Sequence, residues 1–205
     1  MSKAVPYSAS SRGPVDHEVR QQIVVAATEH FRVYGYEKTT VADLAKAIGF
    51  SKAYIYKFFE SKQAIGEVIC SNCLIGIQEI VTTAVAESHG APEKLRRMFK
   101  ALVEASLRLF FEDRKLHNIA ASATVGRWQA TLDHDDWIRL MIESILREGR
   151  DAGDFERKTP LDDGVASIQL VMRPYYNPLL LQHNLDFTDS ALAHLSGLML
   201  RSLSS

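Results

Sequence analysis

The sequence predicts an all-α fold, in which an N-terminal helix-turn-helix domain of three helices is followed by a C-terminal helical bundle. Two observations lead to this prediction. Apolar residues recur at helical spacing in segments that capping residues and glycines separate, and no segment alternates convincingly as a strand. The chain has 205 residues, 46% of them hydrophobic and 24% charged, which is enough for one small and one medium domain.

The composition argues against secreted and membrane-spanning proteins. No run of about 18 apolar residues exists, so no membrane span is expected. The N-terminal residues lack the apolar core of a secretory signal, and two cysteines fit a reducing cytoplasm better than a disulfide framework. Residues 1–66 hold nine Lys/Arg against six Asp/Glu, whereas the remainder holds fifteen against nineteen. A mildly basic N-terminal part is consistent with binding to phosphate groups.

The N-terminal segments predict a tail and two helices. Residues 1–14 are rich in Ser, Ala, Gly and Pro and are expected to form a flexible tail. A first helix follows over residues 15–34, because apolar residues recur there at helical spacing and Gly35 suits its C-terminal end. Thr40 then caps a second helix, and Gly49 ends it. The apolar faces of both helices are expected to pack on a third.

The third helix follows a tight turn and is capped by Ser51. Its residues Ile55, Phe58 and Phe59 are expected to point inward, which leaves its outer face free. Two short helices joined by a glycine turn are typical of a helix-turn-helix, whose second helix enters a DNA groove. Helix starts also attract phosphate through their free N–H groups. Each lysine alone is most often a solvated surface residue, but the joint pattern predicts DNA contacts at Thr40, Ser51, Lys52, Ala53, Tyr54, Tyr56, Lys57 and Lys62.

The remaining chain is predicted to be helical throughout. Ser61 caps a fourth helix that runs to about residue 88, so that a displacement at one end of this helix is felt at the other. Further helices are expected over residues 92–112, 115–130, 134–152, 161–183 and 188–203, the last capped by Thr188. The predicted domains are the tail (1–14), a DNA-binding domain (15–62) and a ligand-binding and dimerisation domain (63–205), with residues 61–88 as the connecting helix.

One stretch of the N-terminal half carries recognisable motifs. The sequence AATEHFRVYGYEKTTVADLAKAIGFSKAYIYKFFESKQAI contains a G-Y/F-x-x-T-T step, a D-L-A-x-x-I/A-G-x-S segment and a Y-x-F-F-x-S-K close. With these motifs, residues 19–66 resemble the N-terminal domain of the TetR family of bacterial transcriptional regulators. The resemblance implies an all-helical homodimer that represses transcription by binding a palindromic operator on double-stranded DNA, until a small molecule in the C-terminal domain releases it. Tyr54 departs from the family pattern, in which a small hydroxyl residue is common.

The last two predicted helices carry apolar stripes that suit a dimer interface. Two such helices from each subunit can pair as a four-helix interface with two-fold symmetry. A homodimer is also favoured because a lone helix-turn-helix covers too little DNA for tight specific binding. Ordinary packing within one subunit is the alternative. The stripes consist of Leu161, Val165, Ile168, Val171 and Met172 in one helix and of Leu192, Leu195, Leu198 and Met199 in the other.

A ligand pocket is predicted among the helices of the C-terminal half. Pro174 and Pro178 interrupt a long apolar helix, and such irregular backbone often lines a cavity. A kink at the dimer seam is the alternative. A mostly apolar wall would suit a small apolar or aromatic effector. The candidate ligand contacts are large or polar groups beside apolar stretches, each of which has core or surface packing as its alternative: Phe110, His117, Asn118, Trp128, Trp137, Met172, Arg173, Tyr175 and Tyr176.

Cys70 and Cys73 form a C-x-x-C pair, which we interpret as packing within a helix. A redox pair usually sits at a helix start after a strand, and a zinc site needs about two more ligands than the sequence offers. A redox- or metal-responsive regulator remains the alternative. The sequence shows no nucleophile elbow, phosphate loop or metal set, and residues 134–136 (His-Asp-Asp) are interpreted as an acidic first helical turn. No catalytic residue, metal or cofactor is therefore predicted, and a small helical enzyme is a further alternative.

Overall fold

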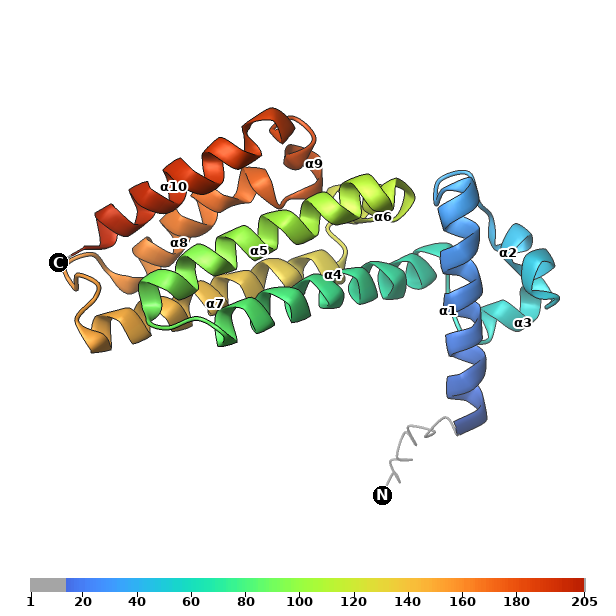
Figure 1. Ribbon diagram of the computed structural model, residues 1–205. Helices are drawn as coiled ribbons and strands as arrows, with labels where there is room; N and C mark the ends of the chain where they lie inside the picture. Colours follow the sequence, from blue (N-terminus) through green and yellow to red (C-terminus); the bar gives the residue numbers. More distant parts are fainter. Residues whose placement is uncertain (1–13, 205) are drawn as a thin grey trace, which may run out of the picture.

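The computed structural model describes residues 14–204, and over that range it consists of helices and their connections (Figure 1). This confirms the predicted all-α fold class. The predicted tail, residues 1–14, lies outside the described residues apart from Pro14. Three helices form the head, namely α1 (Pro14–Tyr34), α2 (Val41–Ile48) and α3 (Lys52–Tyr56).

The larger body extends away from the head as an elongated bundle (Figure 1). Its long helices are α4 (Lys62–Ala86), α5 (Ala91–Glu112) and α7 (Gln129–Ala152), and α6 (Arg114–Val125) lies next to the head. The chain ends with α8 (Leu161–Met172), α9 (Pro178–Leu181) and α10 (Thr188–Leu203), together with the short 3-10 turns η1 (Arg173–Tyr175) and η2 (Leu185–Phe187).

The connecting helix α4 is the central element of the body. By length and composition alone α4 would be long and apolar enough to cross a membrane, contrary to the expectation that no such segment exists. Within the chain α4 contacts α1, α5, α6 and α7, and this packing buries 33% of its apolar window. Its buried residues belong to one hydrophobic core that continues from the head into the body.

The helix predicted over residues 161–183 is broken into three pieces, so that prediction was wrong. Pro174 lacks the N–H that would continue the helix, and η1 replaces it. Asn177 then restarts the chain as α9, because its side chain accepts a hydrogen bond from the N–H of Leu179 at 3.0 Å and Pro178 occupies the first helical position. Thr188 begins α10 but donates its hydroxyl to the Leu185 carbonyl instead of capping.

Candidate nucleic-acid interface and ligand cavity

Caps and one glycine define the helix-turn-helix. Gly49 ends α2 at φ +78°, a conformation that glycine adopts without steric cost. The Ser51 hydroxyl then accepts a hydrogen bond from the N–H of Tyr54 at 3.1 Å and caps α3. Thr40 and Asp43 form a reciprocal capping box at the start of α2. The local sequence therefore sets where each of the two helices begins.

Burial divides α3 and the turn after it into two sides, as predicted. Ile55, Phe58 and Phe59 are only 0%, 7% and 2% exposed. Arg20 of α1 supports this side, because its guanidinium lies 4.1 Å from the centre of the Phe59 ring and donates a hydrogen bond to the Phe58 carbonyl. The opposite side, called the recognition edge below, is exposed and consists of Lys52, Ala53, Tyr54, Tyr56 and Lys57.

The two tyrosines of the recognition edge differ in how many aromatic contacts hold their rings in place. The Tyr54 ring packs edge-on against Phe50 and Phe58, at centroid distances of 5.0 and 5.2 Å. These contacts fix the orientation of Tyr54 and leave only part of the ring for a ligand. Tyr56 has fewer contacts, with the Lys52 ammonium 5.7 Å from its ring centre. Tyr56 is thus the more exposed of the two tyrosines, at 44% against 36% for Tyr54.

Lys62, a predicted phosphate contact, lies where head and body meet. Its ammonium donates a hydrogen bond to the Tyr36 carbonyl at 3.0 Å and sits 4.2 Å above the Tyr36 ring. That ring in turn meets the indole of Trp128 edge-on at a centroid distance of 5.5 Å, and Gly66 lets α4 approach both rings. Tyr36, Lys62, Gly66 and Trp128 are called the joint below. The role of Lys62 at phosphate stays a prediction.

Two polar contacts also connect head and body. Arg32 of α1 pairs with Asp113, the cap of α6, at 2.6 Å. The Ser122 hydroxyl of α6 donates to the Glu37 carboxylate at 3.1 Å. Sequence analysis missed the joint and both of these contacts, because their partners are far apart in sequence and follow no local pattern.

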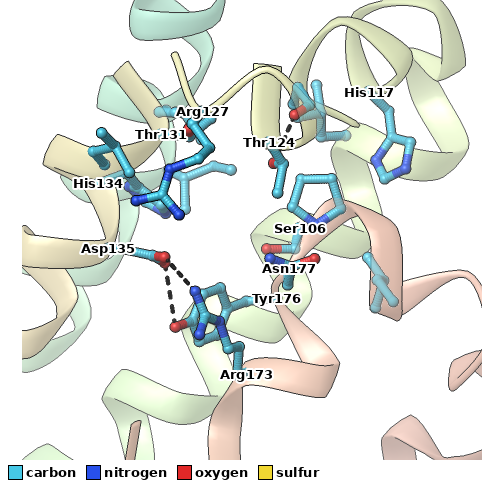
Figure 2. A pocket seen from close by; sticks show the side chains of 17 residues that line it. Ser106, His117, Thr124, Arg127, Thr131, His134, Asp135, Arg173, Tyr176 and Asn177 are labelled. Atoms are coloured by element: carbon cyan, nitrogen blue, oxygen red, sulfur yellow. Dashed lines mark hydrogen bonds and ion pairs between the residues drawn. The ribbon is translucent and has the colours of Figure 1, made fainter. Parts of the chain in front are cut away.

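The body contains a cavity of about 110 Å³ between α4, α5, α6, α7 and the broken segment after α8 (Figure 2). Three of the predicted ligand contacts, His117, Arg173 and Tyr176, line it. Its apolar wall comprises Leu74, Ile77, Leu109, Ala120, Leu132, Pro178 and Leu181. The sequence analysis missed the remaining polar lining, which is made up of Ser106, Thr124, Arg127, Thr131, His134, Asp135 and Asn177.

An ion pair closes one end of the cavity (Figure 2). The Arg173 guanidinium donates to the Asp135 carboxylate at 2.8 Å, and the Tyr176 hydroxyl lies 3.5 Å from the same group. The prediction that residues 134–136 form an acidic first helical turn was wrong, because α7 begins five residues earlier, at Gln129. The negative charge of Asp135 is neutralised within the protein.

Two buried histidines face the cavity in their neutral form. Burial lowers the pKa of His134 to about 4, and burial together with the nearby Arg114 lowers the pKa of His117 to about 4. Gln78 lies 3.2 Å from Nδ1 of His134. If the Gln78 amide donates this bond, the proton of His134 is on Nε2.

The other predicted ligand contacts lie outside the cavity lining. Asn118 is exposed, and Met172 is buried in the core. Phe110 packs edge-on against His117 at 4.7 Å, Tyr175 packs on Phe99, and Trp128 belongs to the joint. Trp137 stacks on His134 with ring centroids 5.9 Å apart, so it contacts a lining residue without lining the cavity itself.

The C-x-x-C pair lies within α4. Burial raises the pKa of Cys70 to about 12 and that of Cys73 to about 11. Because the thiolate is the reactive form of cysteine, both groups are poorly suited to redox sensing near neutral pH. Within residues 14–204, no three His, Cys, Asp or Glu side chains come together as a metal site.

The apolar stripes predicted for a dimer are largely core. Val165, Ile168 and Met172 are buried because α8 packs on α7, and Met199 is buried on α10, which packs on α5. For these four residues, packing within one subunit is what the structure shows. The large apolar side chains that α8 and α10 do expose are Leu170, 64% exposed, and Leu198, 54% exposed.

Comparison with known proteins gives matches over both parts of the chain. The family model "Bacterial regulatory proteins, tetR family" matches residues 23–68, and the model "Tetracyclin repressor-like, C-terminal domain" matches residues 91–191. The HTH-type transcriptional repressor DhaR of Mycobacterium sp. (strain GP1) is 24% identical over 144 residues, which are 68% of this chain and 71% of DhaR.

Solved structures share the whole fold. A TetR-family regulator from Cytophaga hutchinsonii has a TM-score of 0.67 at 18% identity, covering 95% of this chain and 98% of that one. The regulator FadR from Bacillus subtilis, solved in complex with stearoyl-CoA, has a TM-score of 0.60 at 20% identity, covering 90% of this chain and 97% of FadR. At these identities the likeness concerns the fold.

Proposed function

The chain belongs to the TetR family of bacterial regulatory proteins and is a DNA-binding transcriptional regulator, and we propose that it represses transcription until a small molecule releases it from a palindromic operator. The recognition edge carries this proposal. It offers two lysines and a free tyrosine on a helix whose other side is anchored in the core, which suits entry into the major groove. Similarity to the repressor DhaR supports repression.

A homodimer follows from the need to place two recognition edges on one operator. The exposed side of α8 carries Leu170 with Ala166 one turn before it, and that of α10 carries Leu198. Exposed apolar side chains mark an interaction site where they join into one patch, as Leu170 and Leu198 would in a dimer. Pairing these two helices with their copies would bury Leu170 and Leu198 about a two-fold axis.

Release is proposed to act through the joint. The cavity-lining residues Thr124, Arg127 and Thr131 flank Trp128 in the chain, and Trp128 packs on Tyr36 of the head. A ligand that displaces this wall therefore shifts the indole against the head. Half-sites of a palindrome lie about 34 Å apart, so a small rotation of each head removes the match to successive grooves.

A gel shift with a palindromic operator, selected from a random DNA library with the purified protein, tests the function. Tyr56→Ala combined with Lys57→Ala removes two exposed side chains of the recognition edge, both expected to contact phosphate, from each subunit. We expect operator affinity to fall at least about 100-fold, because each such contact is worth about 1–3 kcal/mol. Lys100→Ala, an exposed lysine of α5, is the matched control and should bind as the wild type does. Unchanged affinity of the double variant would overturn the assignment, as would failure to select any sequence.

A further inference from the structure

Arg127 is an unusual residue at the mouth of the cavity. Among residues 14–204 it alone combines a side chain with a positive φ, at +50°. Such a conformation costs on the order of 1–2 kcal/mol for a residue with a β-carbon, and strained residues cluster at binding sites. The preceding Gly126 has an ordinary φ of −74°, so the turn places its strain on the arginine and not on the glycine.

The guanidinium of Arg127 is free of protein partners in the described part of the chain. No carboxylate pairs with it and no side-chain hydrogen bond engages it. Figure 2 shows the side chain extending from the turn in the direction of His134 and Asp135. Asp135 is already paired with Arg173. Arg127 is an exposed residue, so it brings one unpaired positive charge to the rim of the cavity, whereas both histidines of the lining are neutral near pH 7.

The hydrogen bonds that the lining residues make also indicate a negatively charged ligand. The hydroxyls of Ser106, Thr124 and Thr131 each donate to a backbone carbonyl nearby in sequence, so they have no proton left for a ligand. The donors of the lining that lack a protein partner include the Arg127 guanidinium, the Asn177 side-chain amide, whose oxygen alone is engaged, and, with Gln78 donating to Nδ1, the Nε2–H of His134. Of these the guanidinium alone carries charge, so a ligand group that accepts several hydrogen bonds and is negatively charged complements it.

The size and the apolar wall limit the rest of the ligand. The cavity measures about 110 Å³, and an apolar cavity of about 150 Å³ holds one benzene molecule. The apolar part of the lining includes Leu74, Ile77 and Leu181. The space is therefore smaller than one that holds benzene, so it limits the enclosed part of a ligand to a short chain or to part of a small ring and excludes a long acyl chain.

We propose that the effector is a compact organic monocarboxylate, whose carboxylate binds Arg127 and whose apolar body packs against Leu74, Ile77 and Leu181. This inference rests on the proposed function, because it names the class of molecule that the regulator senses. The planar fork of arginine matches a carboxylate in a bidentate geometry, and the partly enclosed cavity strengthens the pair relative to bulk water.

Titration calorimetry on the full chain without DNA tests this proposal. Benzoate and hexanoate are the carboxylate probes, and benzamide and benzylamine are the neutral and cationic counterparts of benzoate. We expect at least one carboxylate to bind, benzamide to bind at least about tenfold more weakly than benzoate, and benzylamine not to bind. Failure of both carboxylates to bind, or equal binding of benzoate and benzamide, overturns the proposal.

Two variants localise the charge. Arg127→Gln should weaken carboxylate binding about 10- to 100-fold, the range for loss of a charge-assisted hydrogen-bonded pair, and Arg127→Lys should restore part of it. Arg96→Gln, at an exposed arginine of α5, is the matched control and should bind normally. Circular dichroism verifies that each variant is folded. Unaltered binding by a folded Arg127→Gln refutes the assignment of Arg127.

The operator gel shift separates this proposal from the function on which it rests. If carboxylates bind the cavity but leave the operator complex intact, the ligand class stands and release by ligand fails. If the operator is bound and no carboxylate binds, the regulator stands and the ligand class fails.

Discussion

One added methyl group at position 66 tests whether the joint is close-packed. A β-carbon there would lie 2.8 Å from Cε2 of Tyr36 and 3.1 Å from both Cη2 and Cζ3 of Trp128. Carbon atoms pack best at about 3.5–4.0 Å, so Gly66→Ala forces the two rings apart by roughly 0.5–1 Å. The same helix offers a matched control, since a β-carbon at Gly76 would meet nothing within 4 Å.

The comparison of the two variants isolates the packing effect. Both replacements gain about 1 kcal/mol from the higher helix propensity of alanine, and only Gly66→Ala pays for overpacking, which costs about 1–3 kcal/mol. We therefore expect Gly66→Ala to be roughly 1–3 kcal/mol less stable than Gly76→Ala. For a protein of about this length the difference corresponds to a Tm lower by roughly 2–12 °C.

Thermal and urea unfolding measure the difference, and the operator gel shift measures its consequence. Because displaced rings tilt the head, operator affinity should fall about tenfold or more in Gly66→Ala and stay unchanged in Gly76→Ala. If the two variants unfold at the same temperature, the contacts of Gly66 with Tyr36 and Trp128 are not tight. The proposed route of release through Trp128 would then be refuted.

Two further predictions concern titratable groups in the body. His134 and His117 have pKa values of about 4 in the folded protein and about 6.5 in the unfolded chain. Between these two pH values the unfolded state binds more protons than the folded state. The free energy of unfolding therefore falls as pH drops from about 6.5 toward 4. Urea unfolding should show a loss of up to about 2 kcal/mol per histidine between pH 6.5 and 5, and about half of it should vanish in His134→Gln; a flat wild-type profile contradicts the burial. Burial also raises the pKa of Cys70 and Cys73, so operator affinity should ignore mild oxidant, and a loss that the double serine variant abolishes would favour redox sensing.

Local signals in the sequence were sufficient for most of the fold. Capping residues such as Ser51 and glycines such as Gly49 act within a few residues, so helix starts and ends in the head follow from short patterns. The prediction of one helix over residues 161–183 failed, because its outcome depended on more than short local patterns. Both prolines were visible in the sequence, but whether the chain kinks or restarts depends on the Asn177 cap, whose effect competes with a continuous apolar stripe.

The two candidate sites also differ in how far local sequence patterns predict them. The recognition edge could be predicted, because the side that Ile55, Phe58 and Phe59 bury is determined by helical periodicity within eight residues. The cavity could be predicted only in part, since the prolines pointed to the segment that supplies Arg173 and Tyr176, whereas most of the lining comes from other segments and depends on how α4, α6 and α7 cross. Arg127 was invisible for a further reason, since neither its positive φ nor its lack of a partner leaves any trace in sequence.

The shortness of the turn between α6 and α7 limits how the cavity can act on the head. Arg127 and Trp128 are consecutive, and the N–H of Trp128 bonds the Ala123 carbonyl at 2.9 Å, so the turn moves as a unit. A ligand changes DNA affinity only if it binds two arrangements of this turn unequally. In the release mechanism proposed above, relaxing the positive φ of Arg127 would supply the second arrangement, because it would rotate the next peptide and displace Trp128 against Tyr36. The strain of such a φ, on the order of 1–2 kcal/mol, is comparable with typical allosteric coupling energies of about 1–3 kcal/mol.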